Sequence, residues 1–138
     1  MKPDSIILHH SLTKDGETVS WQAIRRYHLD LGWSDIGYHF GIELVNDHYE
    51  ILLGRMSNVI GAHCRNGGMN AQSLGICFVG NFDIAPPDGR MLLLGFKLIH
   101  CLLTVFEIPK GNIFGHCDFA NRTCPGELFP LEEFKKRG

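Results

Sequence analysis

Hydrophobic positions in this chain occur in short clusters separated by glycine, proline and polar residues, a pattern that predicts a mixed α/β protein. The first cluster is continuous and branched, as expected of a strand buried on both faces, and it leads directly into His9. A turn signal at Asn46 and Asp47 separates two further clusters, which predicts a hairpin. The five predicted strands are residues 6–8, 36–44, 49–53, 73–80 and 113–114.

Two longer segments carry apolar residues at intervals of three and four, and each follows a residue that caps helices well. Ser20 precedes the first segment, which should end at Gly32, and Asp88 precedes the second. The second segment is apolar around most of its circumference and must therefore be covered on most sides. The predicted helices are 21–31, 90–106 and a short one from Pro130. We predict an α/β fold in a single domain, residues 1–138, with a central mixed sheet flanked by helices.

The composition of the chain limits the classes of function that it can have. A chain of 138 residues with 44% hydrophobic content has the size of one globular domain. The net charge is −2, and the longest basic run is 135–137, so we expect no nucleic-acid partner. The longest apolar stretch, 91–106, is interrupted by Lys97 and His100 and is shorter than the roughly 20 residues that cross a bilayer. We therefore expect no membrane span.

The start of the chain and the cysteines bear on the compartment. The first residues lead within a few positions into the first predicted strand, so we expect synthesis without a signal peptide. Five cysteines, an odd number at scattered positions, do not form the pattern of a disulfide-rich secreted domain. We expect reduced thiols and folding in the cytosol, and the place of action stays open.

Three residues suggest a metal site. His116 and Cys124 stand eight positions apart, and His9 follows the first strand. Zinc favours imidazole nitrogen and thiolate sulfur, and three protein ligands leave one position for water, which distinguishes catalytic from structural zinc sites. We predict that the segment ending at His9 and the segment from His116 to Cys124 are the two halves of one catalytic zinc site.

Two other interpretations use the same segment. Cys117 and Cys124 could form a structural thiolate pair, although two further ligands at comparable spacing would be needed, and Cys64 and Cys77 do not form a short Cys-x2-Cys knuckle. Alternatively, Cys117 could be a thiol nucleophile with a distant histidine as its base. The residues alone leave both alternatives open.

Five blocks of sequence carry a resemblance to a known family. They are Ile7-Leu8-His9-His10-Ser11, residues 32–40 (GWSDIGYHF), Gly61-Ala62-His63, residues 70–76 with Asn70 and Ser73-Leu74-Gly75-Ile76, and residues 115–126 with Gly115-His116 and Cys124-Pro125-Gly126. In these blocks the chain resembles the type 2 N-acetylmuramoyl-L-alanine amidases, a family that includes phage lysozyme-like amidases and peptidoglycan recognition proteins. The blocks follow the family's order and cover about residues 6–129.

The resemblance implies that the chain is a zinc amidase and suggests roles for several of its residues. Zinc would be held by His9, His116 and Cys124, and because binding-only members characteristically lack this cysteine, its presence favours an enzyme. Tyr38 matches the tyrosine that the enzymes need beside the metal. Arg122 stands where the family usually has Lys or Thr, and we expect it to donate to the oxyanion. His63 matches a position near the substrate groove, and we assign Asn70 to substrate binding as well.

The implied reaction is hydrolysis of the amide bond between N-acetylmuramic acid and L-alanine in peptidoglycan or its fragments. The alternative is a non-catalytic peptidoglycan-binding receptor module. Within the enzyme class, an endolysin acting on the cell wall and an amidase acting on cytosolic wall fragments both fit the sequence. The oligomeric state stays open.

Other residues near these blocks are expected to have structural roles. His10 adjoins a predicted ligand but should project to the other side of the strand, and His39 is similarly placed beside Tyr38. We expect Trp33 in the core. We expect Asp118 to brace the loop that follows the last strand, or to hydrogen-bond to a metal ligand, rather than to bind zinc itself. His28, on a predicted helix, should be a satisfied or surface histidine.

Overall fold

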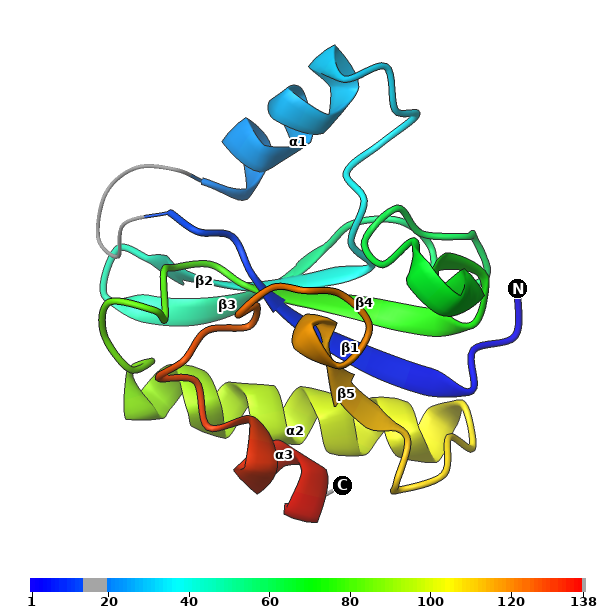
Figure 1. The fold of residues 1–138 in the computed structure, drawn as a ribbon. Helices are drawn as coiled ribbons and strands as arrows, with labels where there is room; N and C mark the ends of the chain where they lie inside the picture. The colour runs from blue at the N-terminus through cyan, green and yellow to red at the C-terminus, as the bar shows by residue number, and fades with distance from the viewer. Residues whose placement is uncertain (14–19, 138) are drawn as a thin grey trace.

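A computed structural model describes residues 1–13 and 20–137, which form a small α/β domain around a five-stranded sheet (Figure 1). The strands are β1 (Ser5–His10), β2 (Phe40–Val45), β3 (His48–Leu53), β4 (Ser73–Phe78) and β5 (Ile113–Gly115). The helices are α1 (Trp21–Asp30), α2 (Gly89–Val105) and α3 (Leu131–Arg137), with short 3-10 segments at Asn66–Ala71 and His116–Asp118.

The sheet is mixed, with strand order β3-β2-β4-β1-β5. The β2–β3 hairpin is antiparallel, whereas β2–β4, β4–β1 and β1–β5 are parallel pairs. All six residues of β1 and of β4 are buried, as expected of central parallel strands covered on both faces. The carboxyl ends of the parallel strands meet at one edge of the sheet, where ligand sites of α/β proteins collect.

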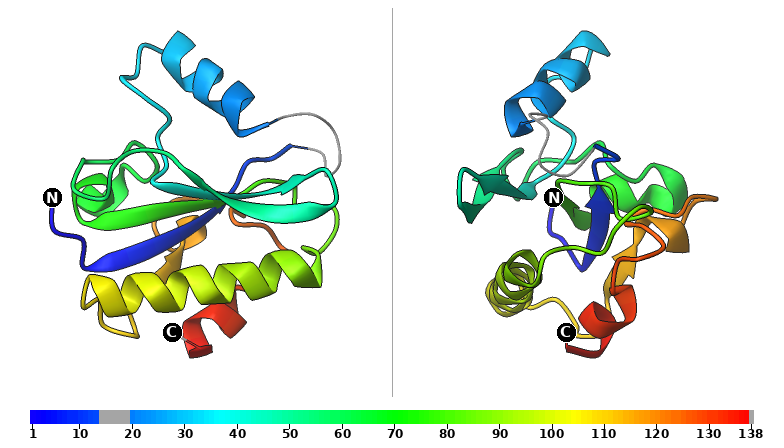
Figure 2. Two further views of the ribbon diagram at one scale, coloured as in Figure 1. Left: turned by 180° about the vertical axis from the view of Figure 1, so that it is seen from behind. Right: turned by 90° about the vertical axis from the view of Figure 1, so that its left-hand side faces the viewer.

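Helices cover the two faces of the sheet unequally, as the views in Figure 2 show. The long helix α2 and the short helix α3 lie on one side, and α1 stands on the other. The α2 side holds the main core, in which Ile6 and Leu8 of β1 pack with alternate residues of β4 and with α2. The opposite face of β1 presents Ile7 and His9, so the alternation of side chains along the strand aims His9 away from the main core.

Local signals explain the helix boundaries. Ser20 accepts a hydrogen bond from the Ala23 N–H, and Asp88 accepts one from the Arg90 N–H, so both predicted N-caps are confirmed. The hairpin turn at residues 46–47 is also confirmed, with Asn46 in the left-handed region at a φ of 58°. The longest of the described helices, α2, has 17 residues, and among the described helices none combines the length and apolarity needed to cross a bilayer.

The predicted strand 36–44 begins too early. The structure starts β2 at Phe40, and residues 36–39 follow an irregular path. The reason lies in the partners of Gly37: its N–H donates to Nδ1 of His28, and its carbonyl accepts from the Ala62 N–H, so its backbone is bonded outside the sheet ladder. The segment is apolar because it is buried, which periodicity alone does not distinguish from strand structure.

Candidate metal centre

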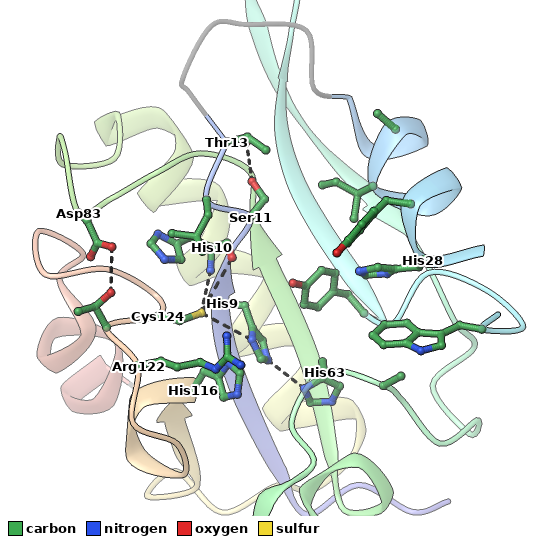
Figure 3. Close-up of a pocket in the computed structure, with 18 residues that line it drawn as sticks. His9, His10, Ser11, Thr13, His28, His63, Asp83, His116, Arg122 and Cys124 are labelled. Carbon is green, nitrogen blue, oxygen red and sulfur yellow. Dashed lines mark hydrogen bonds between the residues drawn. The ribbon is translucent and has the colours of Figure 1, made fainter. Parts of the chain in front are cut away.

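Three side chains from distant parts of the chain converge on one point (Figure 3). The ligand atoms of His9, His116 and Cys124 all lie within 4.8 Å of one another. Nδ1 of His9 is 3.7 Å from Sγ of Cys124, and the rings of His9 and His116 have centroids 4.8 Å apart. His9 and Cys124 are buried, and His116 is half-buried, so the cluster is reached from one side.

Strand register explains why the two histidines meet. β1 and β5 are parallel neighbours, and Leu8 pairs with Gly115. His9 and His116 each follow one position later, at the shared carboxyl edge of the two strands. Cys124 returns to this point because the Cys117 N–H donates to the Cys124 carbonyl at 2.8 Å, which closes the intervening loop. Chain segments over 100 residues apart are therefore brought together by ordinary parallel pairing.

Burial sets the protonation of the cluster. It lowers the pKa of His9 well below its usual value, helped by the nearby His63, and lowers the pKa of His116, to which Arg122 also contributes. Burial raises the pKa of the Cys124 thiol to about 12. The imidazoles are thus neutral at physiological pH, with lone pairs free to bind a cation, whereas the thiol ionises only when positive charge is brought to it.

The donor set fits a zinc ion. Two neutral imidazoles and one sulfur atom are the ligand types that zinc favours, and a three-residue protein set is that of catalytic sites. Sγ of Cys124 also accepts the His10 backbone N–H at 3.4 Å, which supports negative charge on the sulfur. The cluster could therefore hold a divalent ion of this kind through the three predicted residues.

The cluster forms part of the wall of a groove of about 770 Å³. Tyr38 and Arg122 line the same groove, and the ring of Tyr38 lies 5.2 Å from that of His9. Burial, together with Cys77 and Cys124, raises the pKa of Tyr38 well above its usual value, so its hydroxyl stays protonated. Arg122 is exposed and lies beside His116 in Figure 3. The structure thus brings both predicted catalytic residues close to the cluster of His9, His116 and Cys124.

Of the two predicted substrate-binding residues, one contacts a residue of the cluster and the other lines a neighbouring hollow. His63 is buried, and its Nδ1 lies 2.9 Å from Nε2 of His9. Asn70 lines a neighbouring hollow of about 520 Å³, which shares His63, His116 and Arg122 with the groove. Its Oδ1 accepts the backbone N–H groups of His63 and Cys64, each at 2.8 Å, so this oxygen braces the loop. A role of either residue in substrate binding stays a prediction.

Residues 1–127 match the sequence pattern described as N-acetylmuramoyl-L-alanine amidase. The chain belongs to this amidase family. The endolysin of Enterobacteria phage K11 is 32% identical over 134 residues, covering 95% of this chain and 84% of the endolysin. Peptidoglycan-recognition protein SC2 of Drosophila melanogaster is 35% identical over 127 residues, covering 87% of this chain and 66% of that protein.

Solved structures of the amidase family share the fold. N-acetylmuramoyl-L-alanine amidase LysC from Clostridium intestinale is 30% identical, with a TM-score of 0.84, and the match covers 99% of this chain and 85% of LysC. A mutant of Drosophila PGRP-LB in complex with tracheal cytotoxin is 30% identical, with a TM-score of 0.78, and covers 96% of this chain and 80% of that one. The predicted amidase and peptidoglycan-recognition-type fold is therefore confirmed.

Several smaller expectations for this amidase-family chain can be checked directly. His10 points away from the cluster, where its Nδ1 accepts the Phe82 N–H, as predicted. Asp118 braces the loop as predicted, because its carboxylate accepts the Gly115 N–H at 2.9 Å and pairs with Lys135 at 3.0 Å. His39 is fully buried and bonded to backbone, with Nδ1 accepting from Gly75 N–H.

The prediction of Trp33 as a core residue was wrong. Trp33 is 36% exposed and lines the groove, with its ring packed 4.5 Å from that of His28. It lies in the turn after α1, where a large side chain can reach the groove without entering the core. An aromatic residue in a glycine-flanked turn is the signal that could have indicated this.

Sequence reasoning did not assign two residues to the groove. His28 is satisfied, which is one of the two alternatives predicted for it, and it is buried in the groove wall. Asp83 lines the groove and accepts hydrogen bonds from the Thr123 hydroxyl and the Glu127 N–H, each at 2.9 Å. An acidic residue in the loop that follows a buried strand gave a weak signal for Asp83, because the carboxyl edge of the sheet is where sites form.

Proposed function

We propose that this chain is a zinc-dependent N-acetylmuramoyl-L-alanine amidase, with residues 1–138 forming one zinc amidase domain. Membership of the family supports peptidoglycan amidase activity or binding. The observation that favours the enzyme is the convergence of His9, His116 and Cys124 in the wall of a groove. A receptor would need the groove but not three metal donors aimed at one point.

The proposed substrate is peptidoglycan or a soluble muropeptide. Relatives of this chain are named for peptidoglycan recognition, and one was solved with tracheal cytotoxin, a muropeptide. The bond to be broken joins the lactyl carbonyl of N-acetylmuramic acid to the nitrogen of L-alanine. Water adds its oxygen to the carbonyl carbon, the C–N bond breaks, and the amine leaves with a proton.

The residues around the cluster have separate roles in the proposed hydrolysis. His9, His116 and Cys124 would hold the zinc ion, which when bound would supply Lewis acidity that lowers the pKa of water toward about 7 and polarises a carbonyl. In this proposal the neutral Tyr38 hydroxyl orients the attacking water or donates to the carbonyl oxygen. The Arg122 guanidinium donates to that oxygen as negative charge develops on it. Both side chains line the groove beside the ligands.

Replacement of the sulfur ligand tests the proposal. Cys124→Ser is expected to abolish dye release from labelled cell wall, because the hydroxyl of serine is a far poorer zinc ligand than a thiolate. The matched control is Cys101→Ser, which removes an exposed thiol on α2 and should leave hydrolysis unchanged. Chelation should remove the activity of the unmodified protein, and added zinc should restore it.

Binding separates the enzyme from the receptor. The Cys124→Ser protein should still sediment with purified wall, because the groove is intact. Wall binding without hydrolysis by the zinc-loaded unmodified protein would instead support the receptor module. Comparing hydrolysis of intact sacculi with that of soluble muropeptides would distinguish action on the wall from action on cytosolic fragments.

A further inference from the structure

We infer that His63 is a positioning residue that fixes the ring tautomer of His9, so that the Nδ1 lone pair of His9 faces the metal position. This inference rests on the proposed zinc site. It gives His63 a role other than the predicted substrate contact. The contacts of three neighbouring side chains carry it.

The hydrogen bonds of His63 define where its proton lies. Nε2 of His63 faces two oxygen atoms of Ser73, the carbonyl at 3.4 Å and the hydroxyl at 3.5 Å. The Ser73 hydroxyl donates its own hydrogen to the Met69 carbonyl at 2.6 Å, so both Ser73 oxygens present lone pairs to the ring. A neutral His63 is therefore best satisfied with its hydrogen on Nε2, which leaves Nδ1 as an acceptor.

The same assignment extends to His9. Nδ1 of His63 lies 2.9 Å from Nε2 of His9, and two lone pairs cannot share a hydrogen bond, so Nε2 of His9 carries the hydrogen. Nδ1 of His9 then holds the free lone pair, and this atom is the one that lies 3.7 Å from Sγ of Cys124. The Ser73–His63–His9 chain thus selects the one neutral tautomer of His9 that can bind a metal from its observed orientation.

His63 is held rigidly enough for this purpose. A Cβ atom placed on Gly75 would lie 2.5 Å from Cγ of His63, and one on Gly61 would lie 2.6 Å from Cδ2. The ring therefore lies directly on two glycines that leave room for it, on β4 and on its own loop. The His63 backbone N–H also donates to Asn70 at 2.8 Å. With the ring 8% exposed and both nitrogens engaged, little of His63 is left to contact a substrate.

Outer partners of this kind change metal affinity measurably. When the second nitrogen of a ligand histidine loses its hydrogen-bond partner, metal affinity or activity typically falls 10–100-fold. In this chain the partner is another imidazole, which is itself oriented by a serine and enclosed by glycines. The expected effect of removing it is therefore a weaker zinc site in a protein whose three ligands are all present.

Zinc competition with a chromophoric chelator tests the inference on the full-length protein. His63→Leu keeps much of the ring volume but removes the acceptor, and we expect its zinc dissociation constant to rise by about 10–100-fold. His63→Asn places a carbonyl oxygen near the position of Nδ1 and should recover most of the affinity. Leu98→Ala, at a buried position of α2 in the main core, is the control for general destabilisation and should bind zinc as tightly as the unmodified protein.

The possible outcomes separate the two proposals. If the unmodified protein fails to bind zinc, the proposed function and this inference are both overturned. If it binds zinc and His63→Leu binds equally well, only the inference is overturned. Equal weakening in His63→Leu and His63→Asn would overturn the acceptor role and assign His63 to packing alone. Weakening in His63→Leu with recovery in His63→Asn supports the tautomer selection.

Discussion

At the scale of single residues, burial lowers the pKa of the two candidate histidine ligands and raises the pKa of the candidate cysteine ligand. It keeps His9 and His116 neutral, which is the form that binds metal, and it keeps the Cys124 thiol protonated. A bound dication would stabilise the thiolate, so metal binding should release the Cys124 proton. We therefore expect the proposed site to favour a cation that binds sulfur strongly enough to displace that proton, such as zinc.

Arg122 offers a test of electrostatic catalysis at a residue that can be changed without damage to the core. Its side chain is exposed and lines the groove beside His116. If the guanidinium donates mainly to the developing oxyanion, Arg122→Gln should lower kcat by about 10²–10³-fold, with a much smaller change in KM. Steady-state kinetics on a soluble muropeptide would measure both constants.

Two further variants sharpen this test. Arg122→Lys keeps a positive donor at a position where the family usually has Lys or Thr, and it should recover much of kcat. Arg26→Gln removes an exposed arginine of α1 that does not line the groove, and it should leave both constants unchanged. A rise in KM with an unchanged kcat for Arg122→Gln would assign Arg122 to substrate binding instead.

At the scale of elements, the loop that carries Cys124 is fastened at several points. Its start is held by Asp118, which accepts the Gly115 N–H and pairs with Lys135 of α3. Its far end is held by Asp83, from the loop after β4, through Thr123 and Glu127. The Leu128 N–H adds a backbone bond to the Phe82 carbonyl at 2.8 Å. The position of Cys124 thus depends on contacts with the loop after β4 and with α3 as well as on its own loop.

Removing the Asp83 contacts should loosen the metal centre without unfolding the protein. The two hydrogen bonds lower the pKa of the Asp83 carboxyl, which is therefore ionised at neutral pH and a strong acceptor. We expect Asp83→Ala to weaken zinc binding several-fold and to speed amide hydrogen exchange in residues 122–128, as measured by mass spectrometry.

A matched carboxylate on the other side of the sheet provides the control. Asp88 caps α2 through the Arg90 N–H, so Asp88→Ala should lower thermal stability but leave zinc affinity unchanged. Unchanged exchange and unchanged zinc affinity in Asp83→Ala would show that the loop is held without this carboxylate.

At the scale of the whole molecule, the sequence predicted the elements better than their mutual contacts. Strand runs and helix caps are local signals, so β1, β4 and the caps at Ser20 and Asp88 were predicted correctly. The convergence of His9 with the late loop was predicted mainly through the resemblance of five sequence blocks to the amidase family, and the position of His9 at a strand end is consistent with it.

The features that sequence reasoning missed depend on tertiary contacts. Residues 36–39 are buried but not strand, because Gly37 bonds to His28 and to Ala62. Trp33 lies in the groove rather than the core because of the path taken by the chain after α1. The contact between His63 and His9 joins a loop to a strand 54 positions away and has no local signature. Hydrophobic periodicity reports burial, not the partner that causes it.

The two faces of the sheet have different electrostatic characters, and this difference predicts how the metal-free protein responds to acid. The α2 side holds the main apolar core, whereas the groove side holds a cluster of buried histidines. The pKa of His63 is lowered to about 3, mainly by burial and also by His39, His116 and Arg55, against a bond to Ser73 that raises it. The pKa of His9, which contacts His63, is lowered as well.

Because the folded pKa values are depressed, the unfolded chain binds protons that the native protein does not as pH falls below about 6.5. Above this pH the free energy of unfolding has its full value. As the pH falls from there to the folded pKa, the free energy of unfolding decreases by about 1.4 kcal/mol per pH unit for each histidine that stays neutral in the native protein. Chemical denaturation in the presence of a chelator should therefore show a steep loss of unfolding free energy between pH 7 and pH 5. His63→Leu should reduce the slope, whereas His100→Gln, exposed on α2, should not. A flat profile would contradict the prediction, because it would mean that the buried histidines take up protons in the native state as readily as in the unfolded chain.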